Sequence, residues 1–364
     1  MIKATTPQPD VTALSNSPSD SAAIPSAAVI PSPILPLIPN SDVSESPSKL
    51  SLDLEPHTEL EFFSKASKER IAANFGQSAQ AYQSQATLQR QCANKIMAFL
   101  AETCSQRNAP LPDGPILEIG CGTGFITQHL INHFLDTPTP HHPHSKHSLH
   151  ITDLSPDMVN FCQHHITLPN APTPQRPNAP TPQLFFHTLD AETLPSPPQT
   201  YSLIIGGFVA QWFKCLANTV EQLLDQLKPG GILALSFPGD QSFPEWREWC
   251  DRLNLPYTAH PLPNPHTLIQ QLRLSSFQHK LHTEMCPTYY SRAKAFFKSM
   301  KVIGAGASDA GKHLSPVQMR QLLKAWDNAE LEAAVRHTHR QKDDRHVSRI
   351  KVHYQIIYLS ILKA

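Results

Sequence analysis

The stretch Leu117-Glu-Ile-Gly-Cys-Gly-Thr-Gly124 decides the fold. It begins inside a short apolar run, Ile116 to Ile119, that is typical of a strand. The sequence that follows predicts a helix over residues 124–135. Glycines between a strand and a helix let the backbone turn tightly and approach a ligand closely. The pattern therefore predicts a strand–loop–helix unit whose loop contacts a ligand.

The glycines of this loop are Gly120, Gly122 and Gly124, and the acidic Glu118 precedes them. Their spacing is G-x-G-x-G, which differs from the G-x-G-x-x-G of dinucleotide-binding loops. The acid and the glycines together resemble motif I of class I methyltransferases. That resemblance implies that the loop, with Cys121, wraps the methionine part of S-adenosylmethionine. The alternative is a strand–helix turn with three incidental glycines.

Strands and helices alternate after this loop. Strands are expected at residues 116–119, 149–153, 184–187, 201–206 and 231–237, and helices at 124–135, 156–166, 216–227 and 243–253. Two more helices, near 289–301 and 315–326, precede a last apolar strand from Val352 to Leu362 that adds to the sheet. Alternation of this kind predicts an α/β fold with a mostly parallel sheet and helices on both faces. The resemblance implies the Rossmann-like class I methyltransferase fold, with seven strands and an N-terminal helical cap.

The composition indicates one domain with a long tail. The chain has 364 residues, and its 35 prolines against 13 glycines are too many to fit within strands and helices. Residues 1–60 are rich in Ser, Pro, Ala and Asp and predict a disordered tail. The alternative for the tail is a partner-binding segment of polyproline character. Residues 61–364 are expected to form the domain, with loop insertions near 137–147 and 169–183.

The two insertions have unusual sequences. The second contains Asn170-Ala-Pro-Thr-Pro-Gln175 and its direct copy at 178–183, which is too short to be a structural repeat. The first contains a cluster of histidines: His141, His142, His144 and His147. The cluster has no carboxylate or cysteine partner in the sequence, so we expect adventitious metal binding at most and no resident metal.

Charge and cysteine usage narrow the class of protein. The chain has 30 basic and 30 acidic residues, which gives no general reason to expect nucleic-acid or membrane binding. Its seven cysteines include no CxxC pair, which indicates reduced thiols rather than disulfides or a structural zinc site. No secretory signal, transit peptide or membrane span is recognisable. We therefore expect a cytoplasmic protein.

Acidic residues follow two of the expected strands. Asp153, at the end of the second strand, suits a carboxylate that accepts both hydrogen bonds of a ribose diol. Ser155 and Pro156 then suit the N-cap and first position of a helix, so the alternative is that Asp153 only supports this cap. In methyltransferases an Asp after the third strand faces the adenine amino group. Asp190 fits that position, with Ala191 beside the base, although an exposed loop acid is the alternative.

The fourth and fifth strands carry two further motifs. Gly206-Gly-Phe-Val-Ala-Gln-Trp212 ends with a Gln-Trp pair, where we expect a substrate to meet the transferable methyl group. Lys228-Pro-Gly-Gly231 places Pro229 and Gly230 at positions i+1 and i+2 of a type II turn, which we interpret as structural.

The flanking sequences resemble malonyl-carrier-protein O-methyltransferases of biotin synthesis. The resemblance covers about 240 residues through three segments: Arg70 to Tyr82 with Leu88-Gln-Arg-Gln91, then Ala210-Gln-Trp212, then Ser299-Met-Lys-Val-Ile-Gly-Ala305. The chain departs from the family in its tail, in its two insertions and in Gly206-Gly207, where members often carry Ser-Asn. This last departure affects any substrate contact from the fourth strand.

The resemblance implies methyl transfer from S-adenosylmethionine to the free carboxylate of a malonyl thioester. A carboxylate is already ionised at neutral pH, so no general base is required. Catalysis then depends on alignment in a site emptied of water. Tyr82, Gln89 and Trp212 are the candidates for alignment, and Phe75 supports the cap. Lys301 is a candidate cation for the carboxylate, with an exposed helix lysine as the alternative.

The implied partner is an acyl carrier protein, which is acidic, or malonyl coenzyme A. Residues 287–304 contain four basic residues and no acid. Lys294, Lys298 and Lys301 are spaced four and three apart, as one helical face requires. We expect this face to dock the carrier, and the alternative is an ordinary solvated face.

Two other functions fit the same motifs. The first is a methyltransferase acting on another small carboxylate or on a quinone precursor. The second is a methyltransferase-like assembly factor for a respiratory complex, acting as a binding protein or a hydroxylase. The cap and the segment from Ser299 to Ala305 count against the first, and the lack of a recognisable transit peptide counts against the second.

Overall fold

A computed structural model of the chain describes residues 68–69, 72–73, 86–107, 110–135, 147–168, 183–194, 200–274, 277–302, 313–338 and 350–364. These residues all belong to one compact unit, Thr58–Ala364. The expected tail, most of both insertions, and the candidate residues Phe75 and Tyr82 lie outside the described residues.

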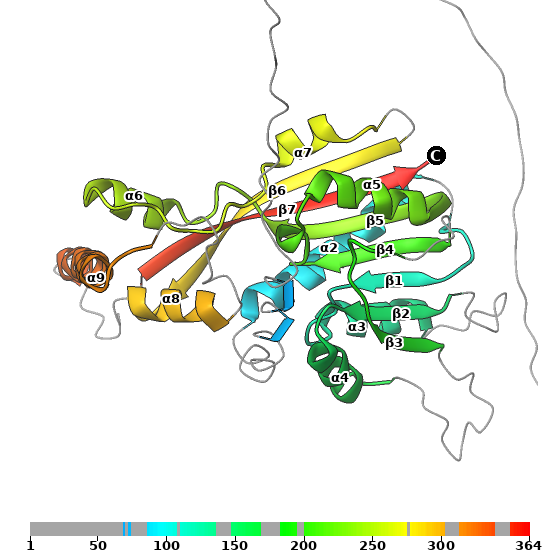
Figure 1. Cartoon of the computed structure of the whole chain (residues 1–364), viewed down its shortest axis with the longest axis horizontal. Coiled ribbons are helices and arrows are strands. Elements are labelled where there is room, and N and C mark those ends of the chain that lie inside the picture. Colours follow the sequence, from blue (N-terminus) through cyan, green and yellow to red (C-terminus); the bar gives the residue numbers. More distant parts are fainter. Residues whose placement is uncertain are drawn as a thin grey trace, which may run out of the picture. The chain divides into compact units, whose positions relative to one another are not determined.

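A seven-stranded sheet forms the centre of the fold (Figure 1). Its strands are β1 (Ile116–Ile119), β2 (Leu149–Asp153), β3 (Leu184–Thr188), β4 (Tyr201–Gly207), β5 (Leu227–Pro238), β6 (Phe277–Tyr290) and β7 (Ile350–Lys363). They lie in the order β3-β2-β1-β4-β5-β7-β6. The first five strands are parallel, and β7 runs antiparallel to both β5 and β6. The predicted fold class is therefore confirmed.

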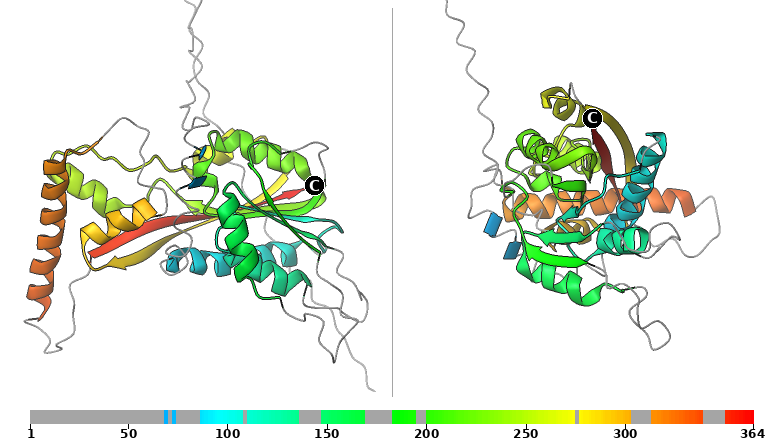
Figure 2. Two further views of the ribbon diagram at one scale, coloured as in Figure 1. Left: turned by 60° about the horizontal axis from the view of Figure 1, so that its bottom comes forward. Right: turned by 90° about the vertical axis from the view of Figure 1, so that its right-hand side faces the viewer.

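Helices cover both faces of the sheet (Figure 2). The helical segments are α2 (Thr87–Gln106), α3 (Phe125–Leu130) continued by the π-helix η1 (Ile131–Leu135), α4 (Pro156–His165), the 3-10 turn η2 (Ala210–Trp212), α5 (Leu216–Gln226), α6 (Pro244–Arg252), α7 (Pro265–Gln271), α8 (Ala293–Val302) and α9 (Pro316–Thr338). Side chains of α2, α3 and α4 pack with one face of the central strands, and those of α5 and α7 pack with the other. All four residues of β1 are buried, because a central parallel strand is covered on both faces.

The strands β6 and β7 extend past the parallel part of the sheet. β7 pairs with β5 from Ile356 to Leu362, but with β6 along its whole length. The helices α6, α8 and α9 lie around this extension (Figure 1). Trp246 of α6, Phe296 of α8 and Trp326 of α9 join one aromatic cluster there, with ring centroids 5.8–5.9 Å apart. α8 and the end of β6 also line a cavity that reaches the segment after β4.

Most predicted elements match the structure, but α9 extends 12 residues beyond the predicted end at residue 326, and several other differences follow. β5 begins at Leu227, so Lys228 to Gly231 lie within an irregular strand start rather than a separate turn, although Gly230 has the positive φ of +75° that such a turn needs. The sequence did not predict α7 or β6, and Tyr289, expected in a helix, belongs to β6. Ser155 occupies the N-cap of α4, but its side chain makes no capping bond.

Two further features bear on the expected class of protein. None of the helices in the described part of the chain is long and apolar enough to cross a membrane. All seven cysteines are described, and none of them forms a disulfide.

Candidate active site

Two glycines of the loop after β1 pack closely against neighbouring segments, and the third borders open space. Gly120, Gly122 and Gly124 have φ values of +67°, +52° and +90°, which favour glycine. A Cβ on Gly120 would lie 2.9 Å from the side chain of Val209, and one on Gly124 would lie 3.0 Å from the sulfur of Cys162. A Cβ on Gly122 would have no described heavy atom within 4 Å. Gly120 and Gly124 therefore allow close packing, while Gly122 borders space that a ligand could use.

Glu118 lies beneath this loop rather than in its opening. Its side chain is 1% exposed and accepts a hydrogen bond of 2.7 Å from the Thr127 hydroxyl of α3. Burial raises the pKa of this carboxyl to about 8, even though the bond from Thr127 opposes the rise. Cys121 is buried too, and its contact with Cys162 and its burial hold its pKa above the ordinary value. Both groups are therefore mainly neutral at pH 7.

Asp153 joins the loop to the end of β2. Its carboxylate accepts hydrogen bonds of 2.9 Å from the backbone N–H groups of Gly122 and Ser155. Burial raises the pKa of Asp153, and these two N–H bonds oppose the rise. The contact with Ser155 fits the predicted support of the helix cap, and the contact with Gly122 fixes the loop as well. Asp153 also lines a cavity, so the cap is not its only possible role.

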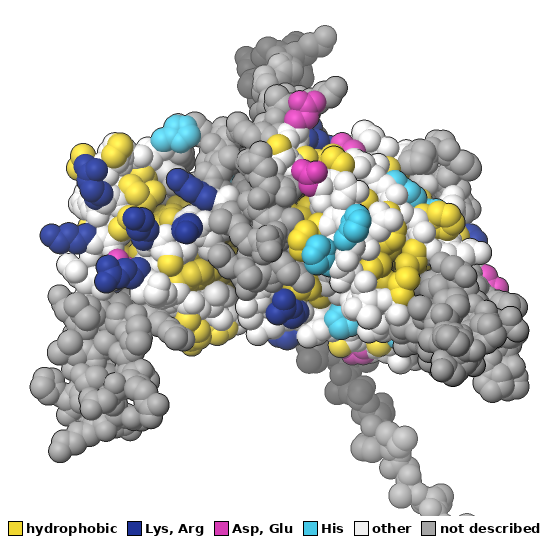
Figure 3. Space-filling view, turned by 90° about the horizontal axis from the view of Figure 1, so that it is seen from below, with side chains coloured by type: hydrophobic (Ala, Val, Ile, Leu, Met, Phe, Trp, Pro, Cys, Tyr) yellow, Lys and Arg dark blue, Asp and Glu magenta, His cyan; other side chains and the backbone are white. Residues whose placement is uncertain are grey.

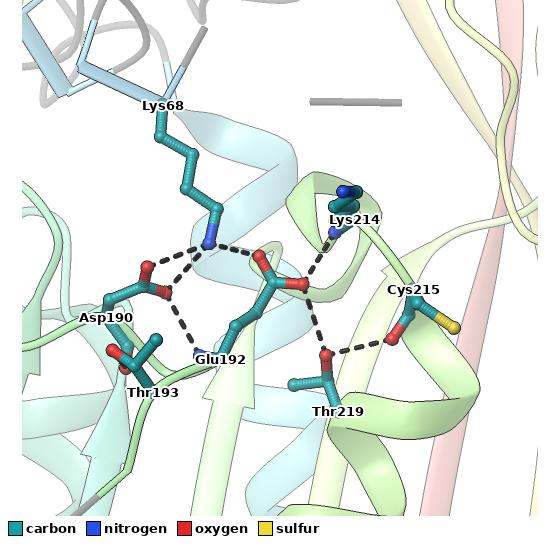
Figure 4. A network of polar contacts seen from close by, with 7 residues as sticks. All are labelled: Lys68, Asp190, Glu192, Thr193, Lys214, Cys215 and Thr219. Atoms are coloured by element: carbon teal, nitrogen blue, oxygen red, sulfur yellow. Dashed lines mark hydrogen bonds and ion pairs between the residues drawn. The ribbon is translucent and has the colours of Figure 1, made fainter. Parts of the chain in front are cut away.

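An ion cluster at the loop after β3 is drawn in Figure 4. Its charged side chains line the same cavity as Asp153. Lys68 lies 2.8 Å from a carboxylate oxygen of Asp190 and forms a second ion pair with Glu192. Glu192 also accepts hydrogen bonds from the backbone N–H of Lys214, at 2.7 Å, and from the Thr219 hydroxyl, at 3.3 Å. Burial lowers the pKa of Lys68, but the bonds and charges of the two carboxylates outweigh it and raise the pKa overall. Lys68 is therefore charged, and it joins a segment far away in sequence to the loop after β3.

The first cavity, of about 100 Å³, lies between the glycine loop and this ion cluster. Five of the predicted cofactor residues line it: Gly120, Gly122, Asp153, Asp190 and Ala191. Glu118, Cys121 and Gly124 are not among its described lining residues. Met158 of α4 and residues between Gly207 and Phe213 also line it, as do Ala72, Leu154 and Leu189.

A second, larger cavity of about 770 Å³ adjoins the first. Its described walls come from the start of α2, the segment after β4, the end of β6, α8 and the segment 255–264. Phe208 and Trp212 line both cavities. These two aromatic side chains therefore mark the place where the cavities meet.

The two cavities differ in charge. The described lining of the first includes Asp153, Asp190 and Glu192, and Lys68 is its only basic side chain. The described lining of the second contains no Asp or Glu, and its basic side chains are His260 and Lys298. One cavity therefore suits a ligand with hydrogen-bond donors or positive charge, and the other suits an anion.

Comparison with known proteins of similar sequence indicates the class of enzyme. Residues 117–233 match the family described as "Methyltransferase domain". The chain is 28% identical over 262 residues to a malonyl-[acyl-carrier protein] O-methyltransferase of Magnetococcus marinus, in a match that covers 70% of this chain and 84% of that protein. It is 26% identical over 311 residues to a protein of the same name from Priestia megaterium, covering 81% and 98%. Among solved structures it is similar to the YcgJ protein of Bacillus subtilis, with 15% identity, a TM-score of 0.44 and coverage of 74% and 98%.

Residues 117–233 are thus similar to a methyltransferase domain, and the rest of the chain lies outside this match. The predicted enzyme class, an S-adenosylmethionine-dependent methyltransferase, is confirmed, and so is the resemblance to malonyl-[acyl-carrier protein] O-methyltransferases.

The methyltransferase brings only some of its predicted substrate residues together. Gln89 in the first turn of α2 and Trp212 of η2 both line the larger cavity. Lys298 lies at the same cavity, whereas Lys294 and Lys301 are exposed on α8 and are not among its described lining residues. Tyr82 and Phe75 lie outside the described residues, so their predicted roles stay predictions.

The methyltransferase also has cavity residues that the sequence did not single out as candidates: Lys68, Glu192, Phe208, Gln211 and His260. Gln211 belongs to the quoted Gln-Trp pair, so its motif was a signal for it. Its side-chain amide donates to the carbonyl of Phe208 at 2.8 Å, and its buried oxygen has no hydrogen-bond partner among the described residues. For Lys68 and His260 the sequence carries no motif, because each is placed by contacts with segments far away in the chain.

Proposed function

We propose that this methyltransferase converts the free carboxylate of a malonyl thioester, carried by acyl carrier protein, into its methyl ester for biotin synthesis. The names of the relatives support this substrate, as do the cap and C-terminal segments that resemble the same family. S-adenosylmethionine supplies a methyl group on a positively charged sulfur. One carboxylate oxygen forms a bond to the methyl carbon as the carbon–sulfur bond breaks, and the bonding electrons return to sulfur. The products are the methyl ester and S-adenosylhomocysteine.

The first cavity suits S-adenosylmethionine. The open space beside Gly122 supports a place for the methionine part, and we propose that the Asp153 carboxylate, which lines the cavity at the end of β2, accepts from the ribose diol. We propose that Asp190, which lines this cavity with Ala191, accepts from the adenine amino group and that Ala191 lies beside the ring. The acidic lining also favours the positive charge on sulfur and on the amino group. Glu118, Cys121 and Gly124 stay predicted cofactor residues, although they are not among the described lining residues of this cavity.

The observation that carries the proposal is the shared wall of the two cavities. Phe208 and Trp212 border both, so a methyl group held beside them would face the anion-compatible cavity. The carboxylate needs no base, because it is ionised at neutral pH. Aromatic walls exclude water from the in-line path, which strengthens electrostatic interactions along it. We propose that Trp212 and Gln89 align the malonyl group, with Tyr82 as a third aligning residue and Phe75 supporting the cap.

Helix α8 supports the proposed carrier partner. Lys294, Lys298 and Lys301 are all exposed on it, and Lys298 also lines the larger cavity. Lys and Arg side chains gather at the end of the face in Figure 3 that holds α8 and α9. An acidic carrier docked on α8 would therefore stand beside the cavity that its thioester has to enter.

The direct test is an assay with purified protein. Incubation with S-adenosylmethionine and malonyl-acyl carrier protein should yield a carrier species heavier by one methylene unit, measured by intact mass spectrometry. Complementation of a biotin auxotroph that lacks this step should restore growth. Soluble protein that methylates neither malonyl-acyl carrier protein nor malonyl coenzyme A would overturn the proposal and favour another small carboxylate, a quinone precursor or a binding role.

The proposed docking face, formed by Lys294, Lys298 and Lys301 of α8, can be tested separately. We expect the double variant K294E/K301E to raise KM for malonyl-acyl carrier protein about tenfold, because it reverses two charges of the docking face. KM for malonyl-pantetheine should stay unchanged, since neither lysine is among the described residues lining the cavity. R273E, at an exposed position after α7, is the matched control. An unchanged KM for the carrier substrate would exclude this face.

A further inference from the structure

We propose that Lys298 binds the phosphate group of the phosphopantetheine arm through which the carrier presents its malonyl group. The inference rests on the proposed function and gives Lys298 a role that Lys294 and Lys301 do not share. A carrier-bound malonyl thioester is a long chain with an anion at each end: the carboxylate that is methylated and the phosphodiester that joins the arm to the carrier. The protein therefore has to hold two anions, and only one of them reacts.

The position of Lys298 on α8 separates it from the two other lysines. Successive residues of a helix are turned by about 100°, so Lys294 and Lys301 project within about 20° of each other, and Lys298 projects about 40° from Lys294. Ala295 and Ser299, which line the larger cavity, lie about 60° and about 100° further round the helix from Lys298. Lys298 is therefore the lysine of the docking face that borders the cavity, and it is among the described lining residues, whereas Lys294 and Lys301 are not.

Lys298 lies at the opening of the cavity. Its side chain is exposed to solvent although it also lines the cavity. The other basic side chain in the described lining, that of His260, stacks with Trp212 at a centroid distance of 6.0 Å. Because Trp212 borders the first cavity as well, His260 lies at the inner wall and Lys298 at the solvent side. A charged group of the substrate that stays close to solvent would therefore meet Lys298.

A lysine suits a phosphate at such an opening. Its ammonium group is a compact point charge with three donors, and it binds phosphate oxygens without the fixed geometry that a guanidinium requires. Among the described residues Lys298 forms no ion pair or hydrogen bond, so its charge is not already shared there. The described lining of the cavity also contains no Asp or Glu that would compete with an incoming phosphate.

The assignment gives the bound substrate a direction. The phosphate lies at α8, and the malonyl end reaches the wall that Phe208 and Trp212 share between the two cavities. The volume of about 770 Å³ is within the range of cavities that hold small molecules, so the arm can lie inside it. Coenzyme A carries the same phosphopantetheine group, so Lys298 would serve both kinds of thioester, while Lys294 and Lys301 would serve the carrier protein alone.

The test uses two small substrates that differ by one group, malonyl-pantetheine and malonyl-phosphopantetheine, whose terminal phosphate stands for the phosphodiester of the carrier. With the unaltered protein, KM should be about fivefold lower for the phosphorylated substrate, the value of an exposed ion pair. K298M should abolish this preference, and K298R, which keeps the charge, should retain most of it. K294M, one helical turn earlier and also exposed, is the matched control and should retain it in full. kcat should be the same for both substrates, because the phosphate takes no part in methyl transfer.

A binding measurement separates this inference from the proposed function. Calorimetry with phosphopantetheine and pantetheine, neither of which carries a malonyl group, should show the same difference of about fivefold in Kd, and K298M should remove it. Turnover without a phosphate preference, or with a preference that K298M leaves unchanged, would overturn the assignment and leave the malonyl substrate standing. A protein that methylates no malonyl thioester but binds phosphopantetheine through Lys298 would overturn the proposed substrate and keep this site for another thioester of the same arm.

Discussion

Glu118 titrates from a buried position, and this gives the protein a specific pH dependence. Its pKa is raised from 4.5 to about 8. Between these values the folded protein keeps a proton that the unfolded chain releases. The free energy of unfolding should therefore fall as pH rises from 4.5 to 8, by up to about 1.4 kcal/mol per pH unit, and then level off.

Replacement of Glu118 by Gln isolates this effect. Gln keeps a hydrogen-bond acceptor for Thr127 but does not titrate, so E118Q should gain stability relative to the unaltered protein between pH 5 and pH 8. Urea unfolding at several pH values measures the difference. E248Q, at an exposed position on α6, should show a constant difference across the range. A constant difference for E118Q as well would show that Glu118 titrates normally.

Lys68 offers a second test at the same scale. K68M removes the charge shared by Asp190 and Glu192, and with it the bond between the described part of the N-terminal segment and the loop after β3. A part-exposed ion pair contributes about 1 kcal/mol, so we expect the Kd for S-adenosylhomocysteine to rise a few-fold. Calorimetry measures the Kd, and K324M at an exposed position on α9 is the control. A Kd that falls would mean instead that Lys68 competes with the adenine amino group for Asp190.

Among the elements, helix α5 has an unusual C-terminal partner. The ammonium group of Lys363, near the end of β7, lies 2.9 Å from the carbonyls of Leu224 and Leu227 and 3.3 Å from that of Asp225. The last carbonyls of a helix have no partner within it, and a cation there also interacts favourably with the helix dipole. K363M should therefore lower the free energy of unfolding by about 1–2 kcal/mol. kcat/KM should not change, and a change in kcat/KM as large as that in stability would contradict a purely structural role.

The elements also explain which parts of the fold could be predicted. β1 and β4 are buried apolar runs, so their composition alone indicates strands. β6 is an edge strand with no fully buried residue, and it contains Pro287, which an edge tolerates. Its sequence therefore lacks the regular alternation of apolar and polar residues that identifies a strand. Its pairing with β7 is what defines it as a strand.

The candidate site likewise contains some residues that could be predicted from the sequence and others that could not. The glycine loop, Asp153 and Asp190 could be predicted because backbone geometry and strand ends place them. Lys68 lies 122 residues from Asp190 in sequence, and His260 meets Trp212 across 48 positions of the chain. Such pairs depend on tertiary packing, which no local pattern records.

The whole molecule has no net charge, yet its charges are unevenly placed. The 30 basic and 30 acidic residues balance, while α8 exposes three lysines beside a cavity whose described lining has no acid. Salt should therefore weaken carrier docking without affecting a small substrate. Raising NaCl from about 50 mM to about 500 mM should increase KM for malonyl-acyl carrier protein several-fold and leave KM for malonyl-pantetheine nearly constant. Equal salt effects on both substrates would locate the response in the active site rather than at the docking face.

The position of β7 has a consequence for synthesis on the ribosome. It is the last strand of the sheet in chain order, but it lies between β5 and β6. The five parallel strands can begin to assemble as they emerge, whereas β6 leaves the exit tunnel before the strand that joins it to the others. Until β7 arrives, the nascent chain exposes the open edge of β5 and an unpaired β6, and exposed strand edges are where aggregation begins. The parallel strands can therefore pair during translation, but the larger cavity, which is lined in part by β6 and β7, has to wait for the final strand.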